Sequence, residues 1–290
     1  PNVVALCADL TDSTRTSDFK KEFPDRFVEV GIGEQSMASL ASGMAAVGKV
    51  PFIASYAMFS PGRNWEQIRT TVCYNNANVK IAGAHSGVSV GPDGATHQAT
   101  EDIAITRVIP NLVVIAPCDA IEAKKATIAA AKHKGPVYLR LTREKTPVMT
   151  TESTPFEIGK AEIFREGGNA TIIVCGPLVY EALKAAEELS KEGIEAEVIN
   201  NHTIKPMDKD TILKSVKKTG CVVTIEEHQA AGGMGSAVSE ILSQNHPAPM
   251  EIMGVKDRFG ESGEPNELLE KFGLTAKNIV EAVRMILKKK

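Results

Sequence analysis

Residues 29–48, EVGIGEQSMASLASGMAAVG, decide how the fold of this chain is interpreted. The apolar residues around position 28 predict a strand over 27–30, two glycines then turn the chain, and small uncharged residues predict a helix over 34–47. Glu34 is the only ionisable residue between Val30 and Lys49. Its carboxylate either complements the helix dipole, as first-turn acids commonly do, or is a partly buried group tuned for chemistry. The other motifs of the chain decide between these two roles.

Short apolar strands alternate with helical segments along the whole chain, which is typical of parallel sheets covered by helices on both faces. The predicted strands are 3–8, 27–30, 51–54, 79–84, 112–116, 137–141, 170–175, 196–199, 220–225 and 250–253. The predicted helices are 34–47, 62–76, 99–107, 119–133, 178–192, 208–218, 232–244, 264–272 and 276–289. A stretch rich in proline and threonine interrupts this alternation near residue 150. We therefore expect an α/β protein with a parallel-sheet domain over 1–145, a linker over 146–157 and a smaller parallel-sheet domain over 158–290.

The composition argues against several functional classes. The 290 residues contain 33 Lys and Arg against 36 Asp and Glu, a formal net charge of −3, and basic residues are grouped only at 288–290. This balance does not predict a nucleic-acid or acidic-membrane surface. The five cysteines form no CxxC pair, and no apolar run approaches the ~18 residues of a membrane span. We expect reduced thiols in a cytoplasmic protein.

Two glycine-containing motifs are weak. GVSVG (87–91) matches a serine-nucleophile pattern, but Pro92 and the residues after it predict a turn where that motif needs a helix. AGGMGSAV (231–238) opens a predicted helix after a strand, yet it lacks the third glycine and the downstream acid of a dinucleotide site. We interpret it as a glycine-rich helix start without a ligand.

Polar residues gather where predicted strands end. His85, Asp93 and His97 lie in AGAHSGVSVGPDGATHQATED (82–102), at the strand edge where open α/β sheets bind ligands. Their spacing does not match a zinc site. Ser13 follows the first strand and Arg143 follows the strand over 137–141, so both belong to the same edge. These groups either bind an anionic ligand or are ordinary loop polar groups and helix caps.

Together these stretches resemble the second half of a transketolase. The resemblance rests on DLTDST (9–14), FPDRFVEVGIGEQSM (23–37), SYAMF (55–59), EQIR (66–69), NVKIAGAHSGVSVGPDGATHQATED (78–102), PVYLRLTR (136–143), HTIKPMD (202–208) and EEHQAAGGMGSAV (226–238). It covers nearly the whole chain, and its G-x-G-E-Q and G-x-D-G-x-T-H-Q elements occur in register. It implies a pyrimidine-binding domain followed by a transketolase C-terminal domain, with thiamine diphosphate as cofactor.

The resemblance assigns a cofactor role to five residues. Glu34 would face N1′ of the aminopyrimidine ring and share a proton with it, Phe59 would stack on that ring, and Tyr56 would stand in the aromatic wall beside it. Asp9 would lie near the cofactor at a subunit boundary. The family pattern has an aromatic residue where this chain has Gly62, and we expect Arg63 to compensate for its loss.

The resemblance also assigns the substrate side. Asp93 and His97 would contact the hydroxyls of a ketose donor and act with Glu34 in catalysis. Ser13, His85 and Arg143 would hold the phosphate of the sugar. The reaction implied is the transfer of a two-carbon ketol unit from a ketose phosphate to an aldose phosphate.

One family element is absent from the sequence. Transketolases hold Mg²⁺ and the diphosphate with a GDG…N motif in a separate N-terminal domain, and no such motif occurs here. The resemblance therefore implies a split enzyme, in which an N-terminal subunit holds the diphosphate and Mg²⁺, in a two-plus-two assembly with this chain. We assign no metal ligand to this chain.

Three other functions remain open on the sequence. 1-Deoxyxylulose-5-phosphate synthase shares the EQ and DGxTHQ elements, although His85 stands where that family has a different pattern. The β subunit of a 2-oxoacid dehydrogenase shares the element around Glu34. A catalytically silent interaction subunit is the third. We expect the C-terminal domain to serve packing and dimer contact, because no set of its residues indicates chemistry.

Overall fold

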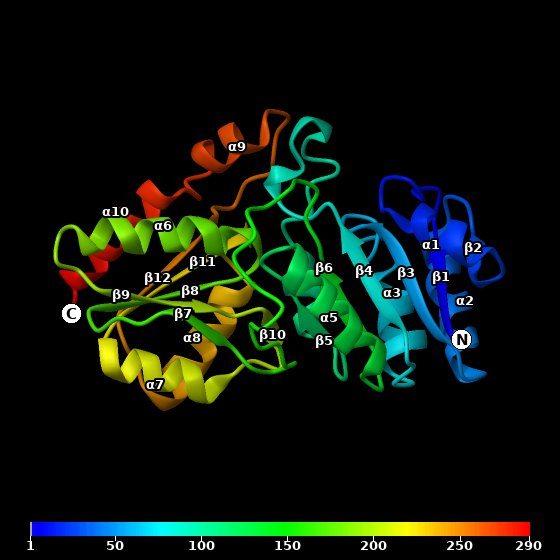
Figure 1. Ribbon diagram of the computed structural model, residues 1–290, viewed down its shortest axis with the longest axis horizontal. Helices are drawn as coiled ribbons and strands as arrows, with labels where there is room; N and C mark the ends of the chain where they lie inside the picture. Colours follow the sequence, from blue (N-terminus) through cyan, green and yellow to red (C-terminus); the bar gives the residue numbers. More distant parts are fainter. Residues whose placement is uncertain (1) are drawn as a thin grey trace.

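The computed structural model describes residues 2–290 and contains two β-sheets that lie side by side (Figure 1). The first has the strand order β10-β5-β6-β4-β3-β1-β2. Its strands are β1 (Val3–Cys7), β2 (Phe27–Glu29), β3 (Val50–Tyr56), β4 (Lys80–Ala84), β5 (Val113–Ile115), β6 (Val137–Arg140) and β10 (Thr203–Lys205). All neighbouring strands are parallel except β10, which is antiparallel to β5. The carboxyl ends of β1, β3, β4 and β6 therefore lie at one edge.

The second sheet has the order β12-β11-β8-β9-β7. Its strands are β7 (Glu162–Arg165), β8 (Ala170–Val174), β9 (Ala196–Asn200), β11 (Val222–Gln229) and β12 (Met250–Val255), and only β7 is antiparallel to its neighbour. The predicted α/β class with two sheet domains is confirmed, although one edge strand of each sheet runs against the others.

The helices are those expected, with three differences. They are α1 (Thr16–Glu22), α2 (Glu34–Ala46), α3 (Trp65–Gln67), α4 (Asp102–Arg107), α5 (Ala120–Lys132), α6 (Val179–Ser190), α7 (Lys209–Thr219), α8 (Met234–Asn245), α9 (Pro265–Lys271) and α10 (Ala276–Leu287). Helix α1 was not expected from the sequence. The helix expected over 62–76 is a short α3 that continues as a π-helix, Ile68–Cys73. The helix expected over 99–107 begins only at Asp102.

The prediction also missed β7 and β10. Strand β10 has three residues, too few to show an alternating pattern, and its partner β5 lies almost 90 residues earlier in the chain. Strand β10 belongs to the second half of the sequence but forms an edge of the first sheet. The division into two domains is thus not a division between two independent sheets.

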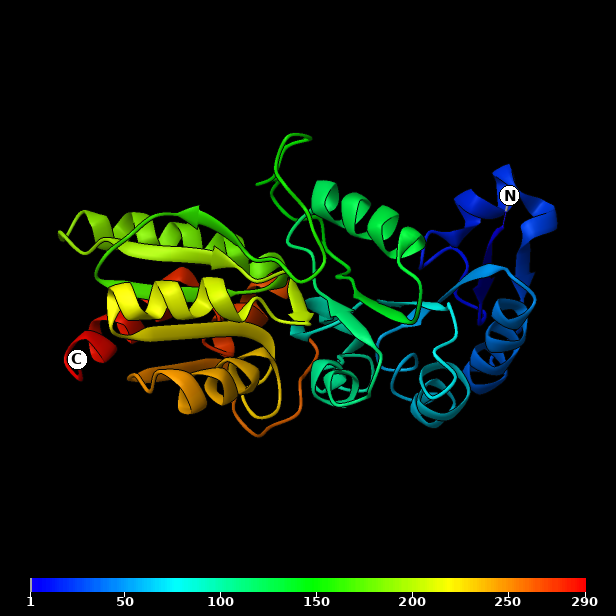
Figure 2. The same cartoon turned by 90° about the horizontal axis from the view of Figure 1, so that it is seen from below.

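One hydrophobic core spans both halves of the chain. It contains Leu6 and Ile53 from the first sheet, Ile173 from the second, and Ile212 and Met234 from helices α7 and α8. Complete burial of such side chains contributes about 1.5–3 kcal/mol each. Helix α8, orange in Figure 2, lies in the second half of the chain, and its Glu240 accepts two hydrogen bonds from Arg107 of α4 in the first half. This shared core fixes how the two sheets sit relative to each other.

None of the helices within residues 2–290 is both long enough and apolar enough to span a membrane.

Candidate active site

Glu34 is the first residue of α2, directly after the turn formed by Gly31 and Gly33. Gly31 has φ +69°, a conformation that favours glycine, so the turn depends on this residue. The turn withdraws the Glu34 side chain from solvent to 2% exposure. Its Oε2 accepts a hydrogen bond of 2.7 Å from Nη1 of Arg63, and no donor among residues 2–290 reaches Oε1. A buried carboxylate at a sheet edge with one oxygen uncommitted is suited to bind a ligand.

Four aromatic or imidazole rings lie together beside Glu34. Tyr56, at the end of β3, stacks on His85 with ring centres 4.1 Å apart and lies nearly parallel to Phe59 at 6.0 Å. His97 meets the edge of Phe59 at 5.4 Å. The structure thus brings residues from three separate segments into one wall.

The turn between Phe59 and α3 explains why the chain has Gly62 where an aromatic residue was expected. A Cβ atom on Gly62 would lie 1.9 Å from the Met58 carbonyl oxygen, so no side chain fits there. The next residue, Arg63, instead places its guanidinium carbon 4.6 Å from the centre of the Phe59 ring. Arg63 therefore contacts both Phe59 and Glu34.

A charged pair lies on the same edge. Arg143 follows β6 and donates from Nη1 to the Val90 carbonyl at 2.6 Å and to Asp93 Oδ1 at 3.4 Å. Burial of His85 and the positive charge of Arg143 lower the pKa of the His85 imidazole to about 4, against the opposing charge of Asp93. His85 is thus neutral near pH 7, and Arg143 is the cation of this group.

Asp9 and Ser13 make no direct contact with these groups in the part of the chain that the structure describes. Both are exposed after β1, and within residues 2–290 no hydrogen bond or ring contact joins their side chains to Glu34, His85 or Arg143. Their loop is held by Glu29, which accepts bonds from the Asp9 N–H and the Thr11 hydroxyl. Partial burial opposes the shift, but the Thr11 hydroxyl and the backbone N–H groups keep the pKa of Glu29 below its usual value.

The loop that carries Asp93 and His97 is fixed by the C-terminal half of the chain. Glu227 Oε1, on β11, accepts a hydrogen bond of 2.5 Å from the Ser89 N–H. Gln98 Nε2 donates to the Val88 carbonyl and to the Glu261 carbonyl, both at 2.9 Å. This loop contains a 3₁₀ segment, Val88–Asp93, and not the strand–serine–helix arrangement of a hydrolase.

The approach of Glu227 is possible because Gly87 has no side chain. A Cβ atom on Gly87 would lie 2.3 Å from Glu227 Oε1. The C-terminal domain therefore does more than the packing expected of it, since it also anchors the polar loop of the first domain.

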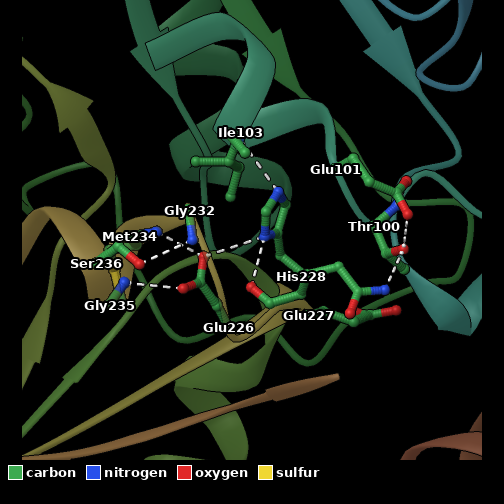
Figure 3. Close-up of polar contacts among 12 residues, drawn as sticks. Thr100, Glu101, Ile103, Glu226, Glu227, His228, Gly232, Met234, Gly235 and Ser236 are labelled. Atoms are coloured by element: carbon green, nitrogen blue, oxygen red, sulfur yellow. Dashed lines mark hydrogen bonds and ion pairs between the residues drawn. The ribbon is translucent and has the colours of Figure 1, made fainter. Parts of the chain in front are cut away.

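Neighbouring residues of β11 join the two halves further (Figure 3). Glu226 accepts from the N–H groups of Met234 and Gly235, at 2.7 and 2.8 Å. His228 Nε2 accepts from the Ala104 N–H at 3.2 Å. The glycine-rich start of α8 is thus bound by a carboxylate of the chain itself, which explains its sequence without a nucleotide.

A buried ion pair at the start of α4 supports the same loop. Asp102 Oδ2 accepts from Arg140 Nε at 2.8 Å and from the Tyr138 hydroxyl at 2.6 Å. Arg140 also donates to the Glu227 carbonyl oxygen at 2.8 Å. The pKa of Tyr138 is well above its usual value because of burial and the Asp102 charge, so the phenol remains a donor.

Comparison with known proteins decides the family. The pyrimidine-binding domain of transketolase matches residues 1–149, and the C-terminal domain of transketolase matches residues 159–279. The chain belongs to the transketolase family. It is 45% identical to a putative transketolase C-terminal section of Methanocaldococcus jannaschii, with 99% of this chain and 91% of that protein aligned. It is 43% identical to a 6-deoxy-6-sulfo-D-fructose transketolase subunit of a Clostridium species, with 99% and 89% aligned.

A solved structure supports this membership. A split-gene transketolase, described as an inactive β4 tetramer, superimposes with a TM-score of 0.93 at 45% identity, with 99% of this chain and 93% of that chain covered. This chain is therefore a C-terminal subunit of the transketolase family. Within residues 2–290, no group of three or more His, Cys, Asp or Glu side chains is placed to hold a metal ion.

Two carboxylates that hold loops of this candidate site were missed by sequence reasoning. Glu227 is one of two adjacent acids in the buried strand β11, and that signal was visible although its partner was not. Glu29 is the last residue of β2, at the strand edge where ligand-binding loops gather. Both act on backbone N–H groups of loops, and no side-chain motif reveals such a contact.

Proposed function

We propose that this subunit transfers a two-carbon ketol unit between phosphorylated sugars, with thiamine diphosphate as cofactor and a second polypeptide holding the diphosphate and Mg²⁺. The observation that carries the proposal is the convergence of Glu34, Phe59 and Tyr56 with His97 and the Asp93–Arg143 pair at one sheet edge. Bound thiamine diphosphate supplies the nucleophilic carbon that accepts the two-carbon unit.

The residues beside Glu34 fit the aminopyrimidine ring of this cofactor. Glu34 has an uncommitted carboxylate oxygen in a site removed from water, where it can hold a proton at the ring nitrogen N1′. Phe59 offers a flat apolar face, and Tyr56 extends that face. Asp9 is exposed after β1, and the Arg63 guanidinium lies over the Phe59 ring, so we propose both as residues that influence cofactor binding.

The substrate side follows from the donors on the same edge. Asp93 accepts hydrogen bonds from the hydroxyl groups of the ketose, and His97 also binds these hydroxyl groups. One ring nitrogen of His97 is hydrogen-bonded to Thr96, which leaves the other ring nitrogen for the substrate. Arg143 supplies a fixed positive charge for the phosphate, while His85, neutral at pH 7, and Ser13 supply uncharged hydrogen-bonding groups.

A partner chain is proposed because this chain lacks the family's diphosphate motif. The similar split-gene transketolase, described as an inactive tetramer of β chains, supports the idea that chains of this type need a second kind of subunit for activity. We propose an assembly of two copies of this chain with two N-terminal subunits. The active site would then lie between the two kinds of chain.

The test is a transfer assay with the complex purified from its own cells. A ketose phosphate donor is compared with the corresponding sulfonated ketose, because the Clostridium relative is named for a sulfo-sugar. We expect turnover only with thiamine diphosphate and Mg²⁺ present, loss of turnover in Glu34→Gln, and preference for the phosphate. A complex that binds thiamine diphosphate but transfers no ketol unit from either donor overturns the proposal.

A further inference from the structure

Arg63 makes two contacts that together describe a particular shape. Its guanidinium group lies over the face of Phe59, with 4.6 Å from the guanidinium carbon to the ring centre. From that position Nη1 donates to Glu34 Oε2 at 2.7 Å. A flat, nitrogen-rich cation therefore rests on the aromatic wall and binds the buried carboxylate.

The aminopyrimidine ring requires these same two contacts under the proposed function. It is also flat and nitrogen-rich, it would stack on Phe59, and it would share a proton with Glu34. Stacked groups need contact at about 3.5–4 Å. While Arg63 covers this face of the Phe59 ring, a second flat group cannot stack on the same face. Arg63 and the cofactor ring therefore compete for this place.

We propose that Arg63 is a displaceable plug that occupies the aminopyrimidine position until the cofactor enters. This inference rests on the proposed function, since it names what governs access to the same site. The plug keeps the buried Glu34 carboxylate paired with a cation when no cofactor is present, and an unpaired buried charge is costly.

The position of Arg63 in the chain suits such a movement. Its side chain is 47% exposed, so it can turn into solvent without disturbing the core. Asn64, by contrast, is fully buried and donates to the Glu34 backbone carbonyl at 3.1 Å and to the Ser60 hydroxyl at 3.1 Å. The backbone of this turn is thus fixed beside α2, and only the side chain of Arg63 has to move.

The two possible roles of Arg63 predict opposite effects of its removal on binding of the aminopyrimidine ring. If Arg63 only replaced the missing aromatic residue, its removal would weaken binding of the ring. If it is a plug, removal strengthens binding. Because the Arg63 side chain is 47% exposed and its charge is screened by solvent, we expect a gain of about threefold to fivefold.

The experiment uses the full chain and the aminopyrimidine half of thiamine as the free hydroxymethyl compound, which has no diphosphate and does not depend on Mg²⁺. Its dissociation constant is measured by ligand-observed NMR with the wild type, Arg63→Ala, Glu34→Gln and the control Arg69→Ala. Arg69 is an exposed arginine on the following π-helix and forms no ion pair within the described residues. Methylguanidinium, below denaturing concentration, is then added as a competitor.

The plug predicts tighter binding in Arg63→Ala, no change in Arg69→Ala, and competition by methylguanidinium that is stronger in Arg63→Ala than in the wild type. Binding that depends on Glu34 but is equal or weaker in Arg63→Ala overturns the plug and leaves the proposed cofactor site intact. Absence of Glu34-dependent binding in both the wild type and Arg63→Ala overturns the cofactor site itself, and the plug with it.

Discussion

Replacing Glu227 tests whether the C-terminal domain holds in place the loop that carries Asp93 and His97. In Glu227→Ala the Ser89 N–H loses its acceptor, a carboxylate oxygen at 2.5 Å. A buried donor left without a partner costs about 1–3 kcal/mol. If about half of a mid-range cost of about 2 kcal/mol appears as disorder of the loop that carries Asp93 and His97, the KM for the ketose donor rises by about fivefold, since each 1.4 kcal/mol is a factor of ten.

The assay is steady-state ketol transfer by the assembled enzyme, with KM and kcat measured separately. Thermal unfolding is measured in parallel. The matched control is Ser215→Ala, which removes a buried hydrogen bond to Glu197 in the same domain, far from the loop. The reasoning is refuted if both variants lower stability alike and Glu227→Ala leaves the donor KM unchanged.

A second variant at this position adds a pH test with a defined sign. Burial raises the pKa of Glu227 above its usual value, against the bonds from Ser89 and the charge of Arg140. The folded chain therefore binds a proton here more tightly than the unfolded chain, and the stability from this group falls as pH rises above about 4.5. Glu227→Gln resembles the protonated form, keeps an acceptor for Ser89, and should remove that part of the pH dependence in urea unfolding.

Three further outcomes follow from contacts around the site. Gly62→Ala should destabilise the chain in urea unfolding, because its Cβ would meet the Met58 carbonyl, and an unchanged midpoint would contradict this geometry. Arg143→Met should raise the pKa of His85 from about 4, since it removes a nearby positive charge; NMR titration of the imidazole checks this, and a fall would contradict it. Asp102→Asn breaks a buried ion pair and should cost about 3–5 kcal/mol of unfolding free energy, whereas a loss below ~1 kcal/mol would show that the pair is not needed.

The sequence was informative where structure depends on local pattern. The turn at Gly31 and the helix after it follow from residues within one short stretch, and they place Glu34 at a helix start. The loops after β4 and β6 begin where apolar runs end. The sequence alone therefore predicts that His85 and Arg143 lie at one edge of the sheet. Parallel strands bring their carboxyl ends together, so the neighbourhood of these residues was predictable even though their distances were not.

The contacts that the sequence did not reveal are made between distant segments. Glu227 and Ser89 are 138 residues apart, and nothing in the composition of either segment identifies the other. Strand β10 forms because it pairs with the edge strand β5 of another domain, and its own three residues do not predict a strand. The crowding at Gly62 arises from how one tight turn closes on its own backbone. Such features depend on tertiary packing, which overrides or completes the local signal.

The distribution of these contacts bears on where the proposed partner chain could bind this transketolase subunit. The boundary between the two domains of this chain is buried and polar, with Glu227 and Arg140 almost fully enclosed. Separating these domains would leave buried charges without partners, which is strongly destabilising. The ends of α2 are different: Ile32, which precedes the helix, and Val47, which follows it, are 77% and 78% exposed. A partner that covers α2 would bury apolar surface without separating the two domains of this chain, which suits the proposed two-subunit assembly.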